Sequence, residues 1–343
     1  MIMLTGPCGI GYKELRRLLA KKVLVTGADG FVGQALCLFL AKNGFQVRGQ
    51  IYAPAELVFA GQAAQAGVEL VTSGDLREFQ RWGDLFAGID AVIHLAAKVH
   101  DMSKDQQRKL AEYRAVNTGL TEQVARQAVK SGVKRLVFVS TIKVNGENTS
   151  AGNSFKETDK PAPQDSYALS KFEAEEILRK IGKETGLETV ILRLPLVYGP
   201  GVKANFLRLI KLVDKGLPLP LKKLNNKRSL IYLGNLTDAL WHCVEDKQAA
   251  NQTFLISDGL DLSTPELINL IAQAMNKKSG LLPFPVNILE GLARITGQSQ
   301  EIDRLTGSLS VDIGKIRSVL GWQPPIGVEQ AIKETVSWYQ KSI

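Results

Sequence analysis

The feature that most constrains the fold of this chain is a glycine-rich loop close to its start. The loop, Thr26-Gly27-Ala28-Asp29-Gly30-Phe31-Val32-Gly33, directly follows the apolar run Val23-Leu24-Val25 and opens a helical pattern. Glycines at this spacing let the backbone turn tightly after a strand and approach a pyrophosphate, which then lies on free N–H groups of the helix. The loop therefore predicts a dinucleotide site formed by Gly27, Asp29, Gly30, Phe31, Val32 and Gly33.

Short apolar runs alternate with helical patterns from Lys22 to about Leu194. Strands are expected over 23–25, 45–51, 91–95, 135–139 and 189–192, with a helix over 33–42. Strands rich in Val, Ile and Leu that alternate with helices are typical of a parallel sheet covered on both faces. The sequence thus predicts an α/β chain with a Rossmann-type doubly wound parallel sheet, which binds ligands at the carboxyl ends of its strands.

The alternation stops after Tyr198-Gly199-Pro200-Gly201, where prolines and lysines begin to cluster. Two later stretches, 235–245 and 253–256, have the pattern of a helix and a strand of the first domain. We therefore expect a dinucleotide-binding domain over 22–196 plus 230–257. A smaller, discontinuous C-terminal substrate domain is expected over 197–229 and 258–343, and residues 1–21 form an N-terminal extension.

The ends of the later strands are also expected to contact the dinucleotide. An acidic residue after the second strand would indicate NAD and an arginine NADP. The chain has Tyr52 there, with Arg48 slightly earlier, so NAD and NADP both stay open. His94 is better explained as a packed strand-end histidine than as a catalytic one, and His100 as a surface-loop residue. Further cofactor contacts are expected from Arg48, from Asp75 and Leu76 after the third strand and from Leu95, Ala96 and Ala97 after the fourth.

A tyrosine and a lysine lie four residues apart in Tyr167-Ala168-Leu169-Ser170-Lys171, on one face of a helix. A phenol with a pKa of about 10 is a weak base near neutral pH, but a nearby ammonium and a nicotinamide cation would lower that pKa. The phenolate can then take a proton from a hydroxyl while hydride leaves the same carbon. Ser140-Thr141, at a strand end, supplies a hydroxyl to hold the oxygen, and Asn117 is a candidate for helix bending or proton relay.

Together these motifs resemble the extended short-chain dehydrogenase/reductase family, in its NAD-dependent epimerase/dehydratase group. The similarity runs from about Lys22 to the C terminus. It implies that Tyr167 is the acid/base and that Lys171 orients it and binds the nicotinamide ribose. Thr141 rather than Ser140 would take the Ser/Thr position, and Pro195 would lie beside the nicotinamide. The chain departs from the family at Asn145, where a Val-Tyr-Gly motif usually has its tyrosine.

The resemblance also bears on the substrate. Dehydratases of this family carry Thr-Asp-Glu where this chain has Thr141-Ile142-Lys143, so 4,6-dehydration is not expected. Asn205 and Arg228 lie in segments that resemble the parts gripping a UDP-sugar, and guanidinium groups bind diphosphate oxygens bidentately. The substrate-binding residues expected on these grounds are Lys98, Thr141, Asn205, Arg228 and Arg304.

Two reactions at C4 of a UDP-hexose or UDP-hexosamine stay open, both in the biosynthesis of surface-polysaccharide sugars. A 4-epimerase keeps its NAD, whereas a 4-keto reductase consumes one cofactor per turnover. Likeness to the UDP-glucose 4-epimerase-like branch favours the epimerase, and the missing acidic residue near Tyr52 favours the reductase. Alternatives are a non-sugar reductase of the same family, which would not need the cations, and a non-catalytic dinucleotide-sensing regulator. Such regulators usually lose part of Tyr-x-x-x-Lys.

The net charge, the number of cysteines and the length of the apolar runs exclude other classes of protein. The net charge of +9 points to an anionic partner, but Lys and Arg look scattered along the chain, so a phosphate-bearing small substrate is expected and nucleic acid is not. Three widely spaced cysteines form neither a disulfide framework nor a metal site, which fits the cytoplasm. No apolar run reaches about 18 residues, so no integral membrane segment is expected. The resemblance is compatible with a homodimer.

Overall fold

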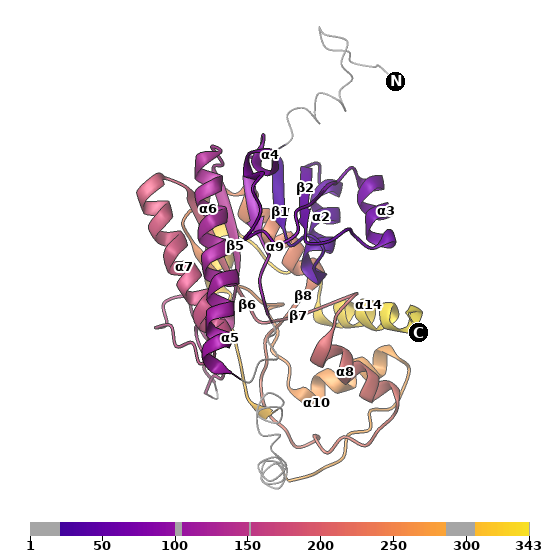
Figure 1. Cartoon of the computed structure of the whole chain (residues 1–343). Helices are drawn as coiled ribbons and strands as arrows, with labels where there is room; N and C mark the ends of the chain where they lie inside the picture. The colour runs from indigo at the N-terminus through magenta and orange to yellow at the C-terminus, as the bar shows by residue number, and fades with distance from the viewer. Residues whose placement is uncertain (1–20, 100–104, 151, 286–305, 343) are drawn as a thin grey trace. The chain divides into compact units, whose positions relative to one another are not determined.

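A computed structural model describes residues 21–99, 105–150, 152–285 and 306–342 (Figure 1). The chain divides into two compact units. The first contains the described residues of Met1–Ser140, together with Asp165–Leu192 and Leu240–Thr253. The second contains Thr141–Gln164, Arg193–Ala239 and the described residues of Phe254–Ile343. Of the expected N-terminal extension, residues 1–20 lie outside the described residues, as do His100 and Arg304.

Seven strands form one sheet in the order β3-β2-β1-β4-β5-β6-β9. The pairs β1–β2, β1–β4, β2–β3 and β4–β5 are all parallel. The strand order reverses between β1 and β4, which is where such sheets bind nucleotides. The predicted α/β fold with a Rossmann-type sheet is confirmed. The strands are β1 (Lys22–Thr26), β2 (Gln46–Ile51), β3 (Glu69–Thr72), β4 (Ala91–His94), β5 (Arg135–Thr141), β6 (Glu188–Leu194) and β9 (Thr253–Leu255).

Apolar side chains alternate along the strands and so cover both faces of the sheet. On one face, Leu24, Val92 and Leu136 belong to a fully buried cluster with side chains of α4, α6 and α7. Helix α7 begins where Asp165 accepts a hydrogen bond from Ala168 N at 2.7 Å and ends at the left-handed Gly186. The helices around this sheet are α2 (Phe31–Lys42), α3 (Leu57–Ala66), α4 (Trp82–Phe86), α5 (Gln106–Tyr113), α6 (Leu120–Lys130), α7 (Ser166–Thr185) and α9 (Leu233–Glu245).

The second unit holds a two-stranded parallel sheet of β7 (Leu196–Tyr198) and β8 (Leu230–Tyr232). Because β8 pairs with β7, residues 230–232 belong to this unit and not to the dinucleotide-binding domain where the sequence placed them. Residues 141–164 also belong here, since Phe155 N donates to Ser310 O at 2.8 Å. The helices of the unit are α8 (Ala204–Asp214), α10 (Thr264–Ala274), α13 (Gly314–Leu320) and α14 (Val328–Lys341).

Candidate active site

The glycine loop lies between β1 and α2, as predicted. Gly27 has a φ of +68°, and a Cβ on Gly33 would lie 2.2 Å from the Gly27 carbonyl oxygen, so neither position accepts a larger residue. Gly30 caps α2 without any side-chain hydrogen bond. The first N–H groups of α2, at Phe31, Val32 and Gly33, are therefore available to an anion, which fits the pyrophosphate of a dinucleotide.

Hydrogen bonds with residues at the end of β2 hold the glycine loop in place. Gly27 N donates to Gln50 Oε1 at 2.9 Å, and Gln50 Nε2 donates to Ser73 Oγ at 2.8 Å. The Asp29 carboxylate accepts from Tyr52 N at 2.9 Å, and the side chain of Tyr52 is 63% exposed. The carboxyl end of β2 thus presents a phenol, not a carboxylate, beside the loop.

Arg48 has a different role from the one predicted for it. Its Nη1 donates to the carbonyl oxygens of Asp84 at 2.7 Å and Leu85 at 2.9 Å, and its Nε lies 2.9 Å from Glu69 Oε2. Glu69 is the first residue of β3, so the guanidinium points toward the amino ends of the strands. Because the glycine loop follows the carboxyl end of β1, Arg48 is a buried structural residue and not a cofactor ligand.

The other predicted strand-end residues differ in exposure. Leu76 is buried in the apolar cluster, while Asp75 is hydrogen-bonded by Arg77, which lowers the pKa of that carboxyl. Leu95, Ala96 and Ala97 follow β4 directly and are partly exposed. A Cβ on Gly27 would lie 2.9 Å from Ala96 N, so this segment runs directly beside the glycine loop.

His94 is a packed strand-end residue, as the sequence suggested. Its Nδ1 lies 2.7 Å from Thr26 Oγ1, and its Nε2 lies 3.1 Å from Thr121 Oγ1. Complete burial lowers the pKa of His94 to about 3, and the Lys171 charge adds to the shift. The imidazole is therefore neutral near pH 7 and joins β1, β4 and α6.

Tyr167 and Lys171 lie one turn apart on α7, as predicted. Lys171 is buried, its Nζ donates to Val139 O at 2.8 Å, and it lies 4.4 Å from the centre of the Phe138 ring. The Tyr167 ring is partly exposed and packs edge-on against Tyr113, with ring centres 5.9 Å apart. The lysine is thus fixed to the carboxyl end of β5, and the phenol is held by α5.

Burial shifts both groups toward their neutral forms. It lowers the pKa of Lys171 to about 7, and the Glu175 charge opposes that shift. It also raises the pKa of Tyr167, to which Asp165 contributes. The expected lowering of the phenol pKa by Lys171 and a nicotinamide cation together concerns the cofactor-bound enzyme and stays a prediction. Two titratable groups with opposed pKa shifts, one helical turn apart, are typical of sites of proton transfer.

Glu175 is a residue that the sequence reasoning missed. It lies on α7 one turn beyond Lys171, and its side chain is fully buried. Its Oε1 accepts from Ser140 Oγ at 2.6 Å, and its Oε2 accepts from Arg179 Nη2 at 3.0 Å. An acidic residue at helical spacing from Lys171, on the apolar face of a helix, was the sequence signal that could have revealed it.

Asn117 lies in a π-helical turn, η1 (Arg114–Gly119), and is fully buried. Its Oδ1 accepts from Lys98 N at 2.8 Å, and its Nδ2 donates to Ser170 Oγ at 3.0 Å. Ser170 Oγ in turn donates to Tyr167 O at 2.7 Å. Asn117 therefore connects the segment after β4 to the backbone of α7, in a turn type that is frequent at functional sites. The ammonium of Lys98 pairs with Glu112 at 3.4 Å.

The remaining predicted residues belong to the second unit. Thr141 ends β5, is 8% exposed and accepts from Lys143 N at 3.3 Å, while Pro195 is buried between β6 and β7. Asn205 is exposed in the first turn of α8. Arg228 is partly exposed, and its Nη1 donates to Gly307 O at 3.0 Å.

Asn145, the departure from the family pattern, is a buried structural residue. Its Nδ2 donates to Lys156 O at 2.9 Å, and its Oδ1 accepts from Arg193 Nη1 at 2.9 Å. Both Asn145 and Arg193 are nearly inaccessible to solvent. The amide therefore fixes the segment after β5 to the end of β6, a function that a tyrosine at this position could not perform in the same way.

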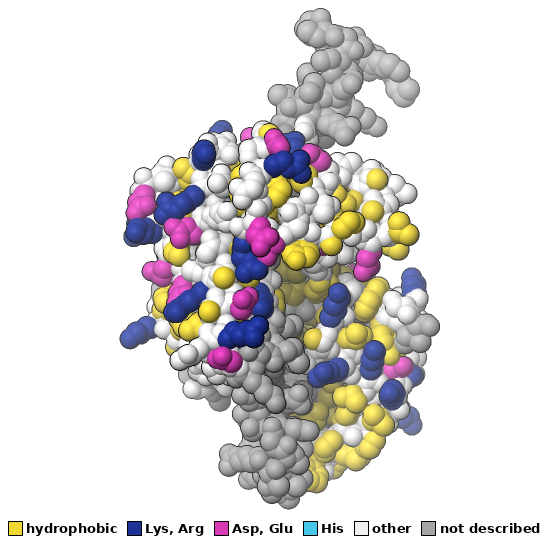
Figure 2. All heavy atoms as spheres, in the orientation of Figure 1, with side chains coloured by type: hydrophobic (Ala, Val, Ile, Leu, Met, Phe, Trp, Pro, Cys, Tyr) yellow, Lys and Arg dark blue, Asp and Glu magenta, His cyan; other side chains and the backbone are white. Residues whose placement is uncertain are grey.

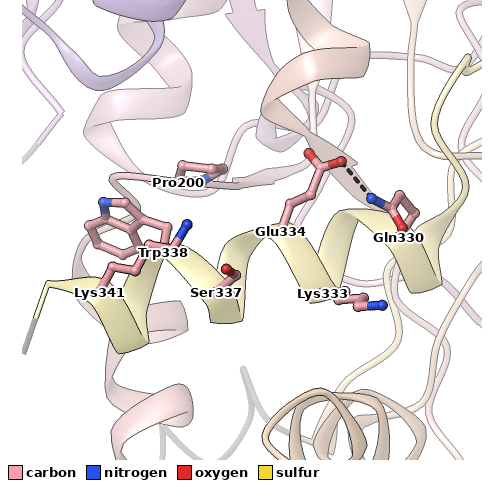
Figure 3. A pocket seen from close by; sticks show the side chains of 7 residues that line it. All are labelled: Pro200, Gln330, Lys333, Glu334, Ser337, Trp338 and Lys341. Carbon is pink, nitrogen blue, oxygen red and sulfur yellow. Dashed lines mark hydrogen bonds between the residues drawn. The ribbon is translucent and has the colours of Figure 1, made fainter.

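The second unit also contains a pocket of about 520 Å³ (Figure 3). One face of α14 lines it together with Pro200, and its polar groups include Lys333 and Lys341. Glu334 accepts hydrogen bonds there from Tyr232 Oη and, at 2.8 Å, from Gln330 Nε2. None of the residues predicted for the site lines this pocket, so it is not the candidate active site.

The fold and these residues match a known family. The model of the NAD dependent epimerase/dehydratase family matches residues 23–257. The chain belongs to this family. Over 321 residues it is 41% identical to a UDP-glucose 4-epimerase of Vibrio cholerae, covering 93% of this chain and 95% of that protein.

Two further comparisons extend this likeness. An N-acetyl-alpha-D-glucosaminyl-diphospho-ditrans,octacis-undecaprenol 4-epimerase of Escherichia coli O157:H7 is 27% identical, with 92% of this chain and 94% of that one covered. The crystal structure of UDP-glucuronic acid 4-epimerase from Bacillus cereus with UDP-glucuronic acid and NAD has a TM-score of 0.76 at 22% identity. That match covers 94% of this chain and 100% of the other, and it shows a shared fold.

Neither a membrane span nor a metal cluster is found in the described part of the chain. Within 21–99, 105–150, 152–285 and 306–342, no helix has the length and apolar character to cross a bilayer. The same residues contain no group of three or more His, Cys, Asp or Glu side chains placed to hold a metal. Cys37 and Cys243 are buried free thiols.

Proposed function

We propose that this chain is an NAD-dependent 4-epimerase of UDP-sugars, with UDP-glucose as its substrate. The observation that carries the proposal is the Tyr167–Lys171 pair, fixed by Lys171 to the carboxyl end of β5 in the sheet that bears the glycine loop. The 41% identity to a UDP-glucose 4-epimerase over nearly the whole chain supports the choice of reaction.

In this proposal Tyr167 takes the proton from the C4 hydroxyl of the sugar. It returns the proton to the C4 oxygen after the keto sugar has turned its other face to the cofactor. Lys171, as an ammonium, stabilises the phenolate, and the Thr141 hydroxyl donates to the same sugar oxygen. Gly27, Gly30 and the first N–H groups of α2 hold the pyrophosphate of NAD. When bound, NAD supplies the hydride acceptor and donor, and its positive charge lowers the pKa of the phenol.

Substrate binding is assigned to the second unit. Asn205 would contact the nucleotide, and Arg228 would bind the diphosphate, for which a planar guanidinium is better suited than an ammonium. Arg228→Ala should raise KM for the UDP-sugar about tenfold and leave the affinity for NAD unchanged, because one charge-assisted contact is lost. Lys227→Ala, one residue away, is the matched control. Equal effects of Arg228→Ala on both ligands would remove it as a diphosphate ligand.

A 4-keto reductase is the second candidate, and one observation favours it. The position after β2 is the exposed Tyr52, so the carboxylate that would bind the ribose hydroxyls of a retained NAD is missing. A cofactor bound less tightly can exchange in every cycle, as a reductase requires.

The identity of the bound dinucleotide distinguishes the two. The protein is purified without added cofactor and denatured, and any dinucleotide released is identified by chromatography. Stoichiometric NAD is the result expected for an epimerase. Protein that releases no dinucleotide and binds added NADPH would instead establish the reductase.

A further inference from the structure

The positive charge of this chain is concentrated in the second unit. Residues 203–228 contain eight Lys or Arg and a single acidic residue, Asp214, while 271–285 contain two lysines and no acidic residue. This excess of nine equals the net charge of the whole chain, +9, so the rest of the sequence is balanced. The impression that Lys and Arg are scattered along the chain is therefore wrong.

These two segments lie side by side. Lys222 N donates to Leu282 O at 3.1 Å, and Leu282 N donates to Leu219 O at 2.8 Å. Lys277 Nζ reaches Asp214 at the end of α8, which neutralises the one acidic side chain. Residues 203–224, which include α8, and residues 277–285 therefore form one continuous surface, which we call the basic surface.

Apart from Asn205, the exposed side chains of the basic surface are cationic or apolar. Leu212, Leu217 and Leu282 are 37%, 43% and 50% exposed. Figure 2 shows Lys and Arg side chains interspersed with hydrophobic ones in the region of α8, with few acidic groups. The exposed cations of the basic surface are Lys203, Arg208, Lys211, Lys215, Lys222, Lys223, Lys277 and Lys278.

We propose that the basic surface binds the anionic face of a lipid bilayer. Clusters of four to eight Lys or Arg attract anionic headgroups, at about 1 kcal/mol for each cation near the membrane, and exposed leucines insert at the headgroup boundary. Single-stranded nucleic acid fits less well, because its binding uses stacking on aromatic rings. Phe206 is buried and Phe284 is only partly exposed, so the described residues of this surface offer no fully exposed aromatic ring for stacking.

The test is sedimentation of the purified full chain with lipid vesicles. Binding is expected with equal parts phosphatidylcholine and phosphatidylglycerol, absent with phosphatidylcholine alone, and lost at about 1 M salt, where the Debye length is about 3 Å. Lys222→Glu with Lys223→Glu should weaken binding at least about thirtyfold, since two cations near the membrane contribute about that factor. Leu217→Ser with Leu282→Ser should weaken it by a smaller factor without altering its salt dependence.

The matched control is Lys130→Glu with Lys134→Glu, which makes the same charge change at exposed positions of the first unit. It should lower binding less than threefold. The proposal is overturned if the wild type does not sediment with anionic vesicles, if the control weakens binding as much, or if duplex DNA competes fully at equal charge. The vesicles contain no UDP-sugar or dinucleotide, so this outcome is independent of the proposed epimerase activity.

Discussion

Two buried polar clusters, one in each unit, differ in how completely their charged group is hydrogen-bonded. In the second unit, Asp258 Oδ1 accepts from Tyr232 N at 2.9 Å and from Asn235 Nδ2 at 2.8 Å, while Oδ2 accepts from Tyr198 Oη at 2.8 Å. Burial raises the pKa of Asp258, and all three hydrogen bonds oppose the shift. Both carboxylate oxygens are satisfied.

The cluster in the first unit is less complete. Lys171 has three N–H donors, and the contacts found for it are one carbonyl oxygen, of Val139, and the face of Phe138. Burial lowers its pKa to about 7, so its charge is maintained at a cost. The comparison teaches that a buried charged group whose hydrogen-bonding capacity is filled by the protein is structural. A buried charged group that uses only part of this capacity marks a site for a ligand.

The largest effect expected from this comparison is on stability. Asp258→Ala removes the acceptor for three buried donors and should lower the free energy of unfolding by about 3 kcal/mol. Denaturant titration measures it. A loss below about 1 kcal/mol would mean that the three hydrogen bonds contribute little and that the two clusters do not differ in this respect.

Tyr167→Phe tests the phenol. Turnover should fall at least about a hundredfold, because general acid–base catalysis contributes about that factor, while the affinity for NAD should stay the same. Tyr113→Phe, whose ring packs against Tyr167, is the control and should retain most of the turnover. Unchanged turnover in Tyr167→Phe would remove this residue from the mechanism.

Lys171→Met should abolish activity and yet stabilise the fold. The folded-state pKa of about 7 lies below the ordinary value of 10.5, so the folded protein binds the proton less well than the unfolded chain does. Wild-type stability should therefore rise between pH 7 and about 10. Lys171→Met should lack this rise and be about 4 kcal/mol more stable at pH 7. Lys180→Met, exposed on the same helix, should change neither quantity, and a destabilised Lys171→Met would contradict the account.

Glu175→Gln should have the smallest effect. Loss of the Glu175 charge lowers the pKa of Lys171 further, so the alkaline limb of kcat/KM should move by about half a pH unit toward acid. The pH profile of Glu176→Gln, at the next and exposed position, is the control. A limb that does not move would make Glu175 purely structural.

Much of the fold and part of the candidate site follow from sequence because they depend on local spacing. The glycine loop and the Tyr167–Lys171 pair are set within one turn or one helix, and both lie where the sequence placed them. Arg48 was assigned wrongly because the direction of its side chain depends on carbonyl groups more than thirty residues away. Glu175 carries a local signal, its helical spacing from Lys171, but its hydrogen bond to Ser140 joins two different elements and does not follow from that spacing. The charge of the basic surface was readable, but only when counted by segment.

The central claim is tested most directly with UDP-glucose and the purified protein alone. The sugar nucleotide is incubated without added dinucleotide, and its C4 epimer is followed by proton NMR. We expect a mixture of both epimers to form over many turnovers with no net oxidation. If no epimer forms, and the protein instead consumes NADPH stoichiometrically with a 4-keto sugar nucleotide, the chain is a reductase and the epimerase proposal is wrong.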